Sequence, residues 1–396
     1  MNIQVLTSRS PEDVKEEMIK IGVSPYGIKE MLPKSIPLLI KLGSIDFRAA
    51  NILKQEMLSL GGEAAIPRGA LDGSQKETPV MLIGNQKIFS QLLAKLLLQP
   101  FGLKKIGSEI DLALKKYSDR EFVIRGRHLN LKLGKKTCLM GILNLTPDSF
   151  YDGGKYNVLD SAIQRAEEMV AEGADIIDVG GESTRPGARP VSIKEELQRV
   201  IPVVKGLRKR IKKPISVDTC KSKVARLALD SGANIVNDIT ALRGDKEMAK
   251  VLSRKGAPVI LMHMQGRPQT MQKKPVYRSV ISEIIGFLRN RIKKALEDGI
   301  SFNKIIIDPG IGFGKTVEHN LEIFSRLREF KILGRPILVG PSRKSVIEKI
   351  LNLPLEERLE GTAALVACSI LNGVQIIRVH DVKEMVRAAR MAEAIK

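Results

Sequence analysis

Eight short apolar runs recur between residue 137 and the end of the chain, each separated from the next by a longer stretch. They predict strands at Thr137–Leu145, Ala174–Gly181, Pro214–Thr219, Asn234–Ile239, Pro258–His263, Lys304–Pro309, Pro336–Pro341 and Gln375–His380. The stretches between them have helical periodicity, as at Ser161–Glu172, Ser222–Ser231 and Ser279–Glu297, and several end in the Gly of a helix C-cap. Eight strand–helix units over about 260 residues are typical of a TIM (β/α)8 barrel. The alternative, an open doubly wound sheet, is disfavoured by eight short crossovers and by the lack of a GxGxxG after the first strand.

The part of the chain before the barrel has a different pattern, and a length of 396 residues fits two domains. Strand-like runs at Ile3–Leu6, Ile36–Ile40 and Met81–Ile83 alternate with helical runs at Pro11–Ile21, Phe47–Leu60, Ile88–Leu98 and Ser108–Tyr117. We therefore expect an α+β domain at residues 1–125, a junction at 126–136 and the barrel at 137–396. Within the junction, Leu129–Leu133 could form a hairpin that closes the bottom of the barrel.

Composition restricts the class of protein. The three cysteines lie far apart without a CxxC, which argues against disulfide or zinc frameworks and fits a reducing cytoplasm. We find no signal peptide, and no apolar run reaches the roughly 18 residues of a membrane span. The net charge of +21 comes with only 4% aromatic residues, so we expect no nucleic-acid partner and read the excess as solvated surface that also attracts anionic substrates.

Polar residues stand at all eight predicted strand ends. They are Asn144, Asp178, Glu182 to Arg185, Asp218, Asn237 with Asp238, His263, Asp308, Ser342 to Lys344, and Arg378 to Asp381. In a TIM barrel the catalytic groups lie at the C-terminal ends of the strands. A purely structural barrel does not need polar groups at every end, so this pattern indicates an enzyme.

Several of these segments together resemble a known family. The segments are Met140–Gly154, Ala174–Gly187, Ser216–Thr219, Val236–Ile239, Leu261–Gly266, Ile307–Lys315, Gly340–Ser345 and Ile377–Asp381. Over residues 135–396 they resemble the blocks of dihydropteroate synthase, in the same order and at the same spacing. The resemblance implies condensation of a hydroxymethyl-dihydropterin diphosphate with p-aminobenzoate in the folate pathway, with Mg2+ as cofactor, in a homodimer that sulfonamides target. The N-terminal part resembles an extension of unknown role in some members.

The resemblance and the chemistry of the reaction suggest a role for each strand-end group. A carboxylate such as Asp308 can accept the two parallel donors of the pterin edge, while Asp218 and Asn237 serve other ring nitrogens and Lys344 a ring acceptor. Asp218 could also stabilise a cationic intermediate. Arg378 and His380 suit the diphosphate, with Thr184 and Arg185 beside it, and Thr184 could also touch the pterin. We expect catalysis to depend on Asp218, Lys344, Arg378 and His380.

The remaining roles concern the metal and the amine. Asn144 is a neutral oxygen ligand suited to Mg2+ that already carries diphosphate oxygens, although a loop cap is the structural alternative. The p-aminobenzoate pocket would comprise Phe150, Arg185, Pro186, Phe313 and Ser345. The loops Thr146–Tyr156 and Glu182–Pro190 have the composition of a lid, or of ordinary surface loops. Asp218 and Asn237 could instead be helix N-caps, although we expect Asp238 rather than Asn237 to have that structural role, and we expect His263 to be a packed or hydrogen-bonded wall residue.

Two other functions stay open. A pterin-dependent corrinoid methyltransferase would share the barrel and pterin pocket, but it would leave Thr184, Arg185, Arg378 and His380 without an anion to bind. A binding protein without turnover is the second alternative, and the intact polar groups at every strand end argue against it.

Overall fold

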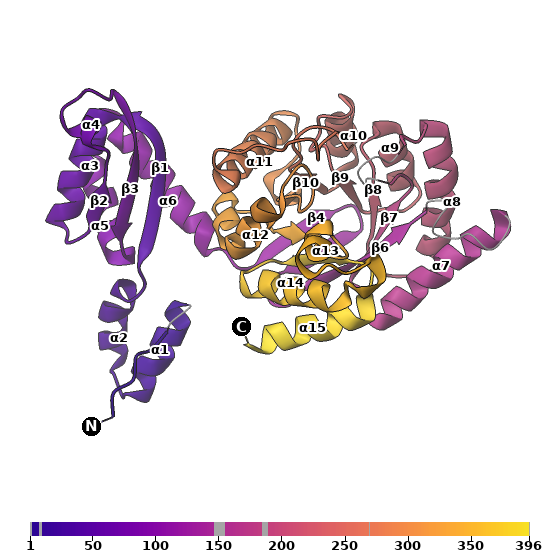
Figure 1. Ribbon diagram of the computed structural model, residues 1–396, viewed down its shortest axis with the longest axis horizontal. Coiled ribbons are helices and arrows are strands. Elements are labelled where there is room, and N and C mark those ends of the chain that lie inside the picture. The colour runs from indigo at the N-terminus through magenta and orange to yellow at the C-terminus, as the bar shows by residue number, and fades with distance from the viewer. Residues whose placement is uncertain (1, 8–9, 146–154, 184–188, 269, 396) are drawn as a thin grey trace. The chain divides into compact units, whose positions relative to one another are not determined.

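The computed structural model describes residues 2–7, 10–145, 155–183, 189–268 and 270–395. The chain divides into two compact units, Met1–Lys115 and Lys116–Lys396 (Figure 1). This division lies nearer the N-terminus than the predicted boundary at residue 125, because the segment that follows it belongs to the barrel.

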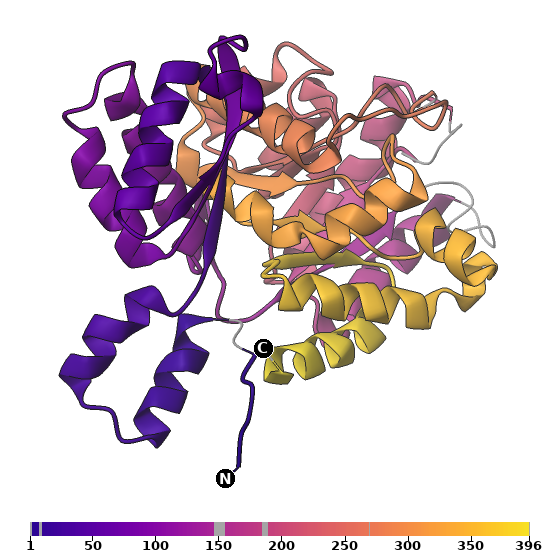
Figure 2. The same cartoon turned by 60° about the vertical axis from the view of Figure 1, so that its left-hand side comes forward.

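The N-terminal unit is a small α+β domain, as predicted. Its antiparallel sheet has the order β1-β3-β2, with β1 at Leu38–Asp46, β2 at Glu63–Ala65 and β3 at Glu77–Gly84. Its helices are α1 (Pro11–Lys20), α2 (Pro25–Met31), α3 (Phe47–Ser59), α4 (Arg68–Leu71), α5 (Gln86–Leu96) and α6 (Leu103–Ser118). Helices α3 and α5 cover one face of the sheet (Figures 1 and 2) and bury Leu53 and Phe89 against Leu82.

Three short elements of this unit, α2, α4 and β2, were not predicted, and one predicted strand is wrong. Ile3–Leu6 has no strand conformation, and its Val5 side chain is 91% exposed. An apolar run forms a strand only where a neighbouring strand pairs with it, and alternation in the sequence cannot supply that partner.

The second unit is a closed parallel barrel, which rules out the open sheet. Its strands are β6 (Cys138–Asn144), β7 (Ile176–Gly180), β8 (Ile215–Asp218), β9 (Ile235–Asp238), β10 (Val259–Met262), β11 (Ile305–Asp308), β12 (Leu338–Val339) and β13 (Ile376–Val379). They are hydrogen-bonded in the order β11-β10-β9-β8-β7-β6-β13-β12. A parallel bridge between Ile307 and Ile337 joins the two ends of this order and closes the ring. Each strand lies within one of the eight predicted runs.

Helices surround the barrel (Figure 1). They are α7 (Lys155–Glu172), α8 (Ile193–Arg210), α9 (Ser222–Asp230), α10 (Met248–Lys255), α11 (Val280–Glu297), α12 (Val317–Ser325), α13 (Ser345–Leu351), α14 (Leu359–Leu371) and α15 (Val382–Ile395). Local sequence explains several ends: the Ser192 hydroxyl caps α8, Thr316 and His319 form a capping box on α12, and Gly256 ends α10 in the left-handed conformation.

A hairpin closes the N-terminal end of the barrel, as predicted for this segment. Strands β4 (Phe122–Gly126) and β5 (Leu129–Leu133) pair antiparallel, and the fully buried Ile124 packs with Leu133 against inward-facing residues of the barrel strands such as Ile306. The opposite, C-terminal end of the barrel is therefore the end at which polar side chains can surround a ligand.

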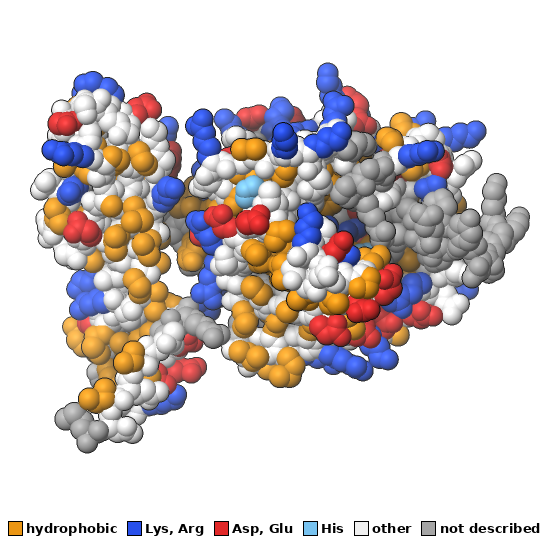
Figure 3. Space-filling view, in the orientation of Figure 1, with side chains coloured by type: hydrophobic (Ala, Val, Ile, Leu, Met, Phe, Trp, Pro, Cys, Tyr) orange, Lys and Arg blue, Asp and Glu red, His pale blue; other side chains and the backbone are white. Residues whose placement is uncertain are grey.

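Charged side chains of both signs lie on the surface of the described residues. On the face shown in Figure 3, Lys and Arg are interspersed with Asp and Glu. Among the described residues, we find no helix with both the length and the apolar character needed to cross a bilayer.

Candidate active site

Strand pairing places several predicted site residues in one row at the C-terminal end of the barrel. Asn144 on β6 pairs with Gly180 on β7, Gly180 pairs with Asp218 on β8, and Asp218 pairs with Asn237 on β9. Farther round the ring, Asp308 on β11 lies opposite Met262 on β10. The parallel register thus brings together groups that are far apart in the sequence.

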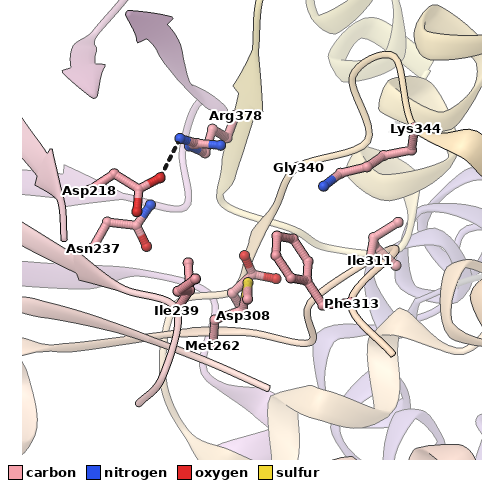
Figure 4. Close-up of a pocket in the computed structure, with 10 residues that line it drawn as sticks. All are labelled: Asp218, Asn237, Ile239, Met262, Asp308, Ile311, Phe313, Gly340, Lys344 and Arg378. Carbon is pink, nitrogen blue, oxygen red and sulfur yellow. Dashed lines mark hydrogen bonds and ion pairs between the residues drawn. The ribbon is translucent and has the colours of Figure 1, made fainter. Parts of the chain in front are cut away.

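These residues surround a pocket of about 340 Å³, part of it open to solvent. Its lining comprises Asp218, Asn237, Ile239, Met262, Asp308, Ile311, Phe313, Gly340, Lys344 and Arg378. Figure 4 shows the polar side chains reaching it from different strand ends. The structure therefore brings together Asp218, Asn237, Asp308, Lys344 and Arg378, which the sequence placed in the site, with Phe313 in the same wall.

A buried ion network organises one side of the pocket. Arg378 Nε donates to Asp178 Oδ2 at 2.6 Å, and Arg378 Nη2 donates to Asp218 Oδ2 at 2.8 Å. Asn237 Nδ2 donates to the same Asp178 oxygen at 3.1 Å. Asp178 therefore holds both Arg378 and Asn237, and it directs the amide oxygen of Asn237 away from itself.

Asp178 is the main residue to which the sequence assigned no role. Its side chain is fully buried, and within the described structure its Oδ1 atom has no hydrogen-bond partner. An Asp inside a buried apolar strand was a usable signal, because an uncompensated carboxylate there would be expensive. The apolar lining residues Ile239, Met262 and Ile311 carried no such signal, since they look like any other core position.

Burial changes the acidity of both pocket carboxyls. The net pKa of Asp218 is raised to about 7: burial is the main cause, the positive charge of Arg378 opposes the shift, and the nearby Asp178 carboxylate adds to it. Burial also raises the pKa of Asp308 to about 6, although the backbone N–H of Gly310 and the positive charge of Lys344 oppose the shift. Such perturbed carboxyls in a pocket are typical of functional sites.

The loop after β11 shapes the opposite wall of the pocket. Gly310, Gly312 and Gly314 all have positive φ, of 72°, 79° and 63°. A Cβ on Gly310 would lie 1.9 Å from the backbone oxygen of His263, so a side chain there is excluded. This winding brings the Phe313 ring to the pocket, where Lys344 Nζ lies 4.5 Å from the ring centroid.

Three predicted site residues lie outside the pocket lining. Asn144 is adjacent, since a Cβ added to Gly180 would lie 3.7 Å from Asn144 Oδ1 and 3.6 Å from Asp218 Cβ. His380 follows β13, and its Nδ1 lies 3.0 Å from the hydroxyl of Ser342. Burial lowers the pKa of His380 to about 3, helped by Arg378, so the imidazole is neutral in the free protein. Ser345 is exposed at the first position of α13.

Four predicted site residues, Phe150, Thr184, Arg185 and Pro186, lie outside the described residues, as does most of the predicted lid loop Thr146–Tyr156.

Asp238 and His263 have structural roles, although Asp238 holds a turn and is not the helix N-cap expected from the sequence. Asp238 accepts hydrogen bonds from the backbone N–H groups of Thr240 and Leu242, each at 2.8 Å, so it holds the turn after β9. His263 is buried, with its ring 4.9 Å from that of Phe287 in an edge-on contact.

Comparison with known proteins is consistent with this geometry. The family described as "Pterin binding enzyme" matches residues 140–380. The dihydropteroate synthase of Synechocystis is 49% identical over 263 residues, which are 66% of this chain and 91% of that protein. A probable bifunctional folylpolyglutamate synthase/dihydropteroate synthase of Halobacterium salinarum is 39% identical over 388 residues, 98% of this chain and 46% of that protein, so this match includes the N-terminal unit.

A solved structure gives the same result for the barrel. The dihydropteroate synthase of Clostridium difficile, crystallised in the presence of pteroic acid, is 51% identical and superimposes with a TM-score of 0.63. The similarity covers 66% of this chain and 98% of that one. On the combined evidence of the closed barrel, the strand-end pocket and these similarities, the chain belongs to the pterin-binding enzyme family and, within it, to the dihydropteroate synthases.

Proposed function

We propose that the pocket binds a hydroxymethyl-dihydropterin diphosphate and that the barrel condenses it with p-aminobenzoate in a Mg2+-dependent reaction. One observation carries the proposal: acceptors suited to a pterin ring (Asp218, Asn237 and Asp308) share a pocket with the cationic side chains of Lys344 and Arg378. A ring-binding site alone would not need the cations, and an anion site alone would not need the carboxylates.

The pose of the ring follows from the directions of the polar groups. Asp308 is the acceptor for the two parallel donors of the pterin edge, because a carboxylate has lone pairs on both oxygens. The Asn237 amide oxygen is then the acceptor for a ring N–H, because the Asn237 NH2 group already donates to Asp178. Lys344 donates to a ring acceptor from the side of the pocket that Phe313 lines.

The reaction needs stabilisation of charge more than it needs a strong base. The amine nitrogen of p-aminobenzoate is neutral at pH 7; it forms the new C–N bond, the C–O bond to diphosphate breaks, and the nitrogen then loses a proton. The electron pair of the broken C–O bond leaves with the diphosphate, so the protein must stabilise the anionic charge that develops on the diphosphate. Arg378 retains positive charge there because Asp178 and Asp218 hold its guanidinium. Asp218 lies where it can stabilise positive charge that develops on the pterin methylene.

The residues present fit a magnesium ion with few protein ligands. In the described part of the chain no three His, Cys, Asp or Glu side chains form a metal-binding group. Asn144 Oδ1 lies at a strand end beside Asp218, and Mg2+ commonly takes one or two protein oxygens together with waters and phosphate oxygens. When bound, the ion would neutralise charge on the leaving diphosphate.

His380 would contribute a hydrogen bond rather than a charge. Ser342 Oγ accepts from the backbone N–H of His380 at 3.2 Å, and its own hydroxyl proton can then go to Nδ1. The imidazole would in that case carry its proton on Nε2 and donate it to a diphosphate oxygen. The tautomer is inferred from this network.

The amine would bind between Phe313 and the two loops that contain Phe150, Arg185 and Pro186, with Ser345 near the outer end. Phe313 supports this assignment because its ring faces the pocket beside Lys344. Arg185 is suited to the carboxylate of p-aminobenzoate through charge-assisted hydrogen bonds.

A diphosphate-release assay tests the proposed function. Folded protein with Mg2+ and the pterin diphosphate should release diphosphate only when p-aminobenzoate or a related aromatic amine is added. Absence of release with every amine, together with methyl transfer from a methylated pterin, would instead support the corrinoid methyltransferase alternative.

A homodimer in the cytoplasm remains a prediction from the family resemblance. Light scattering coupled to size-exclusion chromatography tests the oligomeric state, and cell fractionation tests the location.

A further inference from the structure

Lys315 is a buried cation outside the pocket lining. Its side chain is only 3% exposed, and its Nζ atom has three neutral neighbours: the backbone oxygens of Gly310 and Phe313, at 2.8 and 3.0 Å, and His263 Nδ1 at 3.0 Å. An ammonium group has three N–H donors, so these contacts match its full donor capacity. Burial of a cation is unfavourable unless the protein supplies hydrogen-bond acceptors or a counter-charge. The position of Lys315 therefore suggests a specific role.

The three contacts join two segments of the barrel. Gly310 and Phe313 belong to the loop that follows β11, and His263 follows β10. The loop winds closely against this neighbour, since a Cβ on Gly314 would lie 2.5 Å from the backbone oxygen of Gln265. One atom of Lys315 therefore sets the position of both ends of the segment that presents Phe313 to the pocket.

The arrangement does not depend on one protonation state. Burial lowers the pKa of Lys315 to about 7, and it lowers the pKa of His263 well below its usual range, so the imidazole is neutral. As an ammonium, Lys315 donates to His263 Nδ1. As a neutral amine it can still donate to both carbonyls, while its lone pair accepts a hydrogen bond from Nδ1–H of His263 in the other tautomer.

We propose that Lys315 is a positioning residue for the amine substrate, acting by holding the 310–313 segment so that the Phe313 ring forms one wall of the p-aminobenzoate site. This inference rests on the proposed function. It predicts a larger effect on the amine site than on the pterin site. Lys315 binds the backbone of Phe313 directly, at 3.0 Å. Its link to Asp308 is indirect, through its charge and through Gly310, whose N–H donates to Asp308 at 2.7 Å, and the pairing of β11 with β10 also fixes Asp308.

The main variant is Lys315→Met in the full chain, which keeps the length of the side chain and removes all three donors. Lys304→Met is the matched control. Lys304 lies at the other end of the same strand, in the 3-10 turn Phe302–Lys304, and donates to one carbonyl, that of Gly256, at 2.9 Å. We expect Lys315→Met to raise the KM for p-aminobenzoate by about tenfold or more, with the calorimetric Kd for the pterin changed by less than about threefold. Lys304→Met should change neither constant.

A double-mutant cycle distinguishes positioning from a general loss of stability. If Lys315 acts through Phe313, then Lys315→Met added to Phe313→Ala should raise the KM for p-aminobenzoate little beyond Phe313→Ala alone. Should Lys315→Met fail to fold, Lys315→Gln retains two donors and should show a smaller shift in the same constant. An unchanged KM, or equal losses of pterin and amine affinity, would overturn the inference in either variant. Failure of the wild-type protein to release diphosphate would count against the proposed function instead.

Discussion

Replacement of Asp308 by Ala should abolish most of the affinity for the pterin while the barrel stays folded. Asp308 ends β11, lines the pocket and is the proposed acceptor for the donor edge of the ring. Alanine leaves those two ligand donors without a partner. Each unpaired donor costs roughly 1–3 kcal/mol, so the loss should be about 2–6 kcal/mol, or roughly 30-fold to 20 000-fold in Kd.

The effect on stability should be smaller because two changes oppose each other. The backbone N–H of Gly310 loses its acceptor, which costs roughly 1–3 kcal/mol. In return, the folded state no longer holds a carboxyl whose pKa burial raises to about 6, so an unfavourable desolvation is removed. A melting curve should therefore show a cooperative transition close to that of the wild type.

Isothermal titration calorimetry with the pterin is the assay, and Asp308→Asn is the matched control. The Asn side chain keeps the volume and one acceptor oxygen for Gly310 N–H, but it offers the pterin edge one acceptor and one donor. We expect its Kd to lie between those of the wild type and Asp308→Ala. If both folded variants bind the pterin within threefold of the wild type, Asp308 does not recognise the ring.

Three further predictions concern pH, the ion network and the domain boundary. Because the pKa of Asp308 is raised to about 6, its carboxyl is protonated below that pH and loses an acceptor, so its titration alone should lower pterin affinity by about tenfold between pH 7 and pH 5. Calorimetry at both pH values should show a fall in Asp308→Asn that is smaller than the wild-type fall by about this factor, and equal falls would contradict the role of Asp308. Asp178→Ala removes one partner from the buried Arg378 pair and should lower the free energy of unfolding in urea by about 3–5 kcal/mol, whereas an unchanged value would mean that the network adds no stability. Removal of residues 1–115 should leave diphosphate release measurable, since every assigned residue lies beyond them. Removal of residues 1–126 also deletes β4 with the buried Ile124 and should lower the melting temperature. Equal melting temperatures of the two truncated proteins would contradict the role of the hairpin.

The sequence by itself determined the barrel and most of the residues that line its pocket. Parallel strands buried on both faces appear as continuous apolar runs, so their number and positions could be predicted from local pattern alone. The polar groups at the strand ends stood out for the same reason, because Asp218, Asn237 and Asp308 each interrupt or end such a run. Once eight parallel strands are assumed, their C-terminal ends must meet at one mouth.

Only the tertiary structure decided which of these groups touch. Arg378 reaches Asp178 and Asp218 across 200 and 160 residues of sequence, and no local pattern specifies those partners. The same limit explains why Asp178 received no role and why the contact between His380 and Ser342 was not foreseen. It also explains the wrong strand at Ile3–Leu6. The periodicity of a segment indicates which face it could bury, but the tertiary fold decides whether another strand lies beside it to pair with.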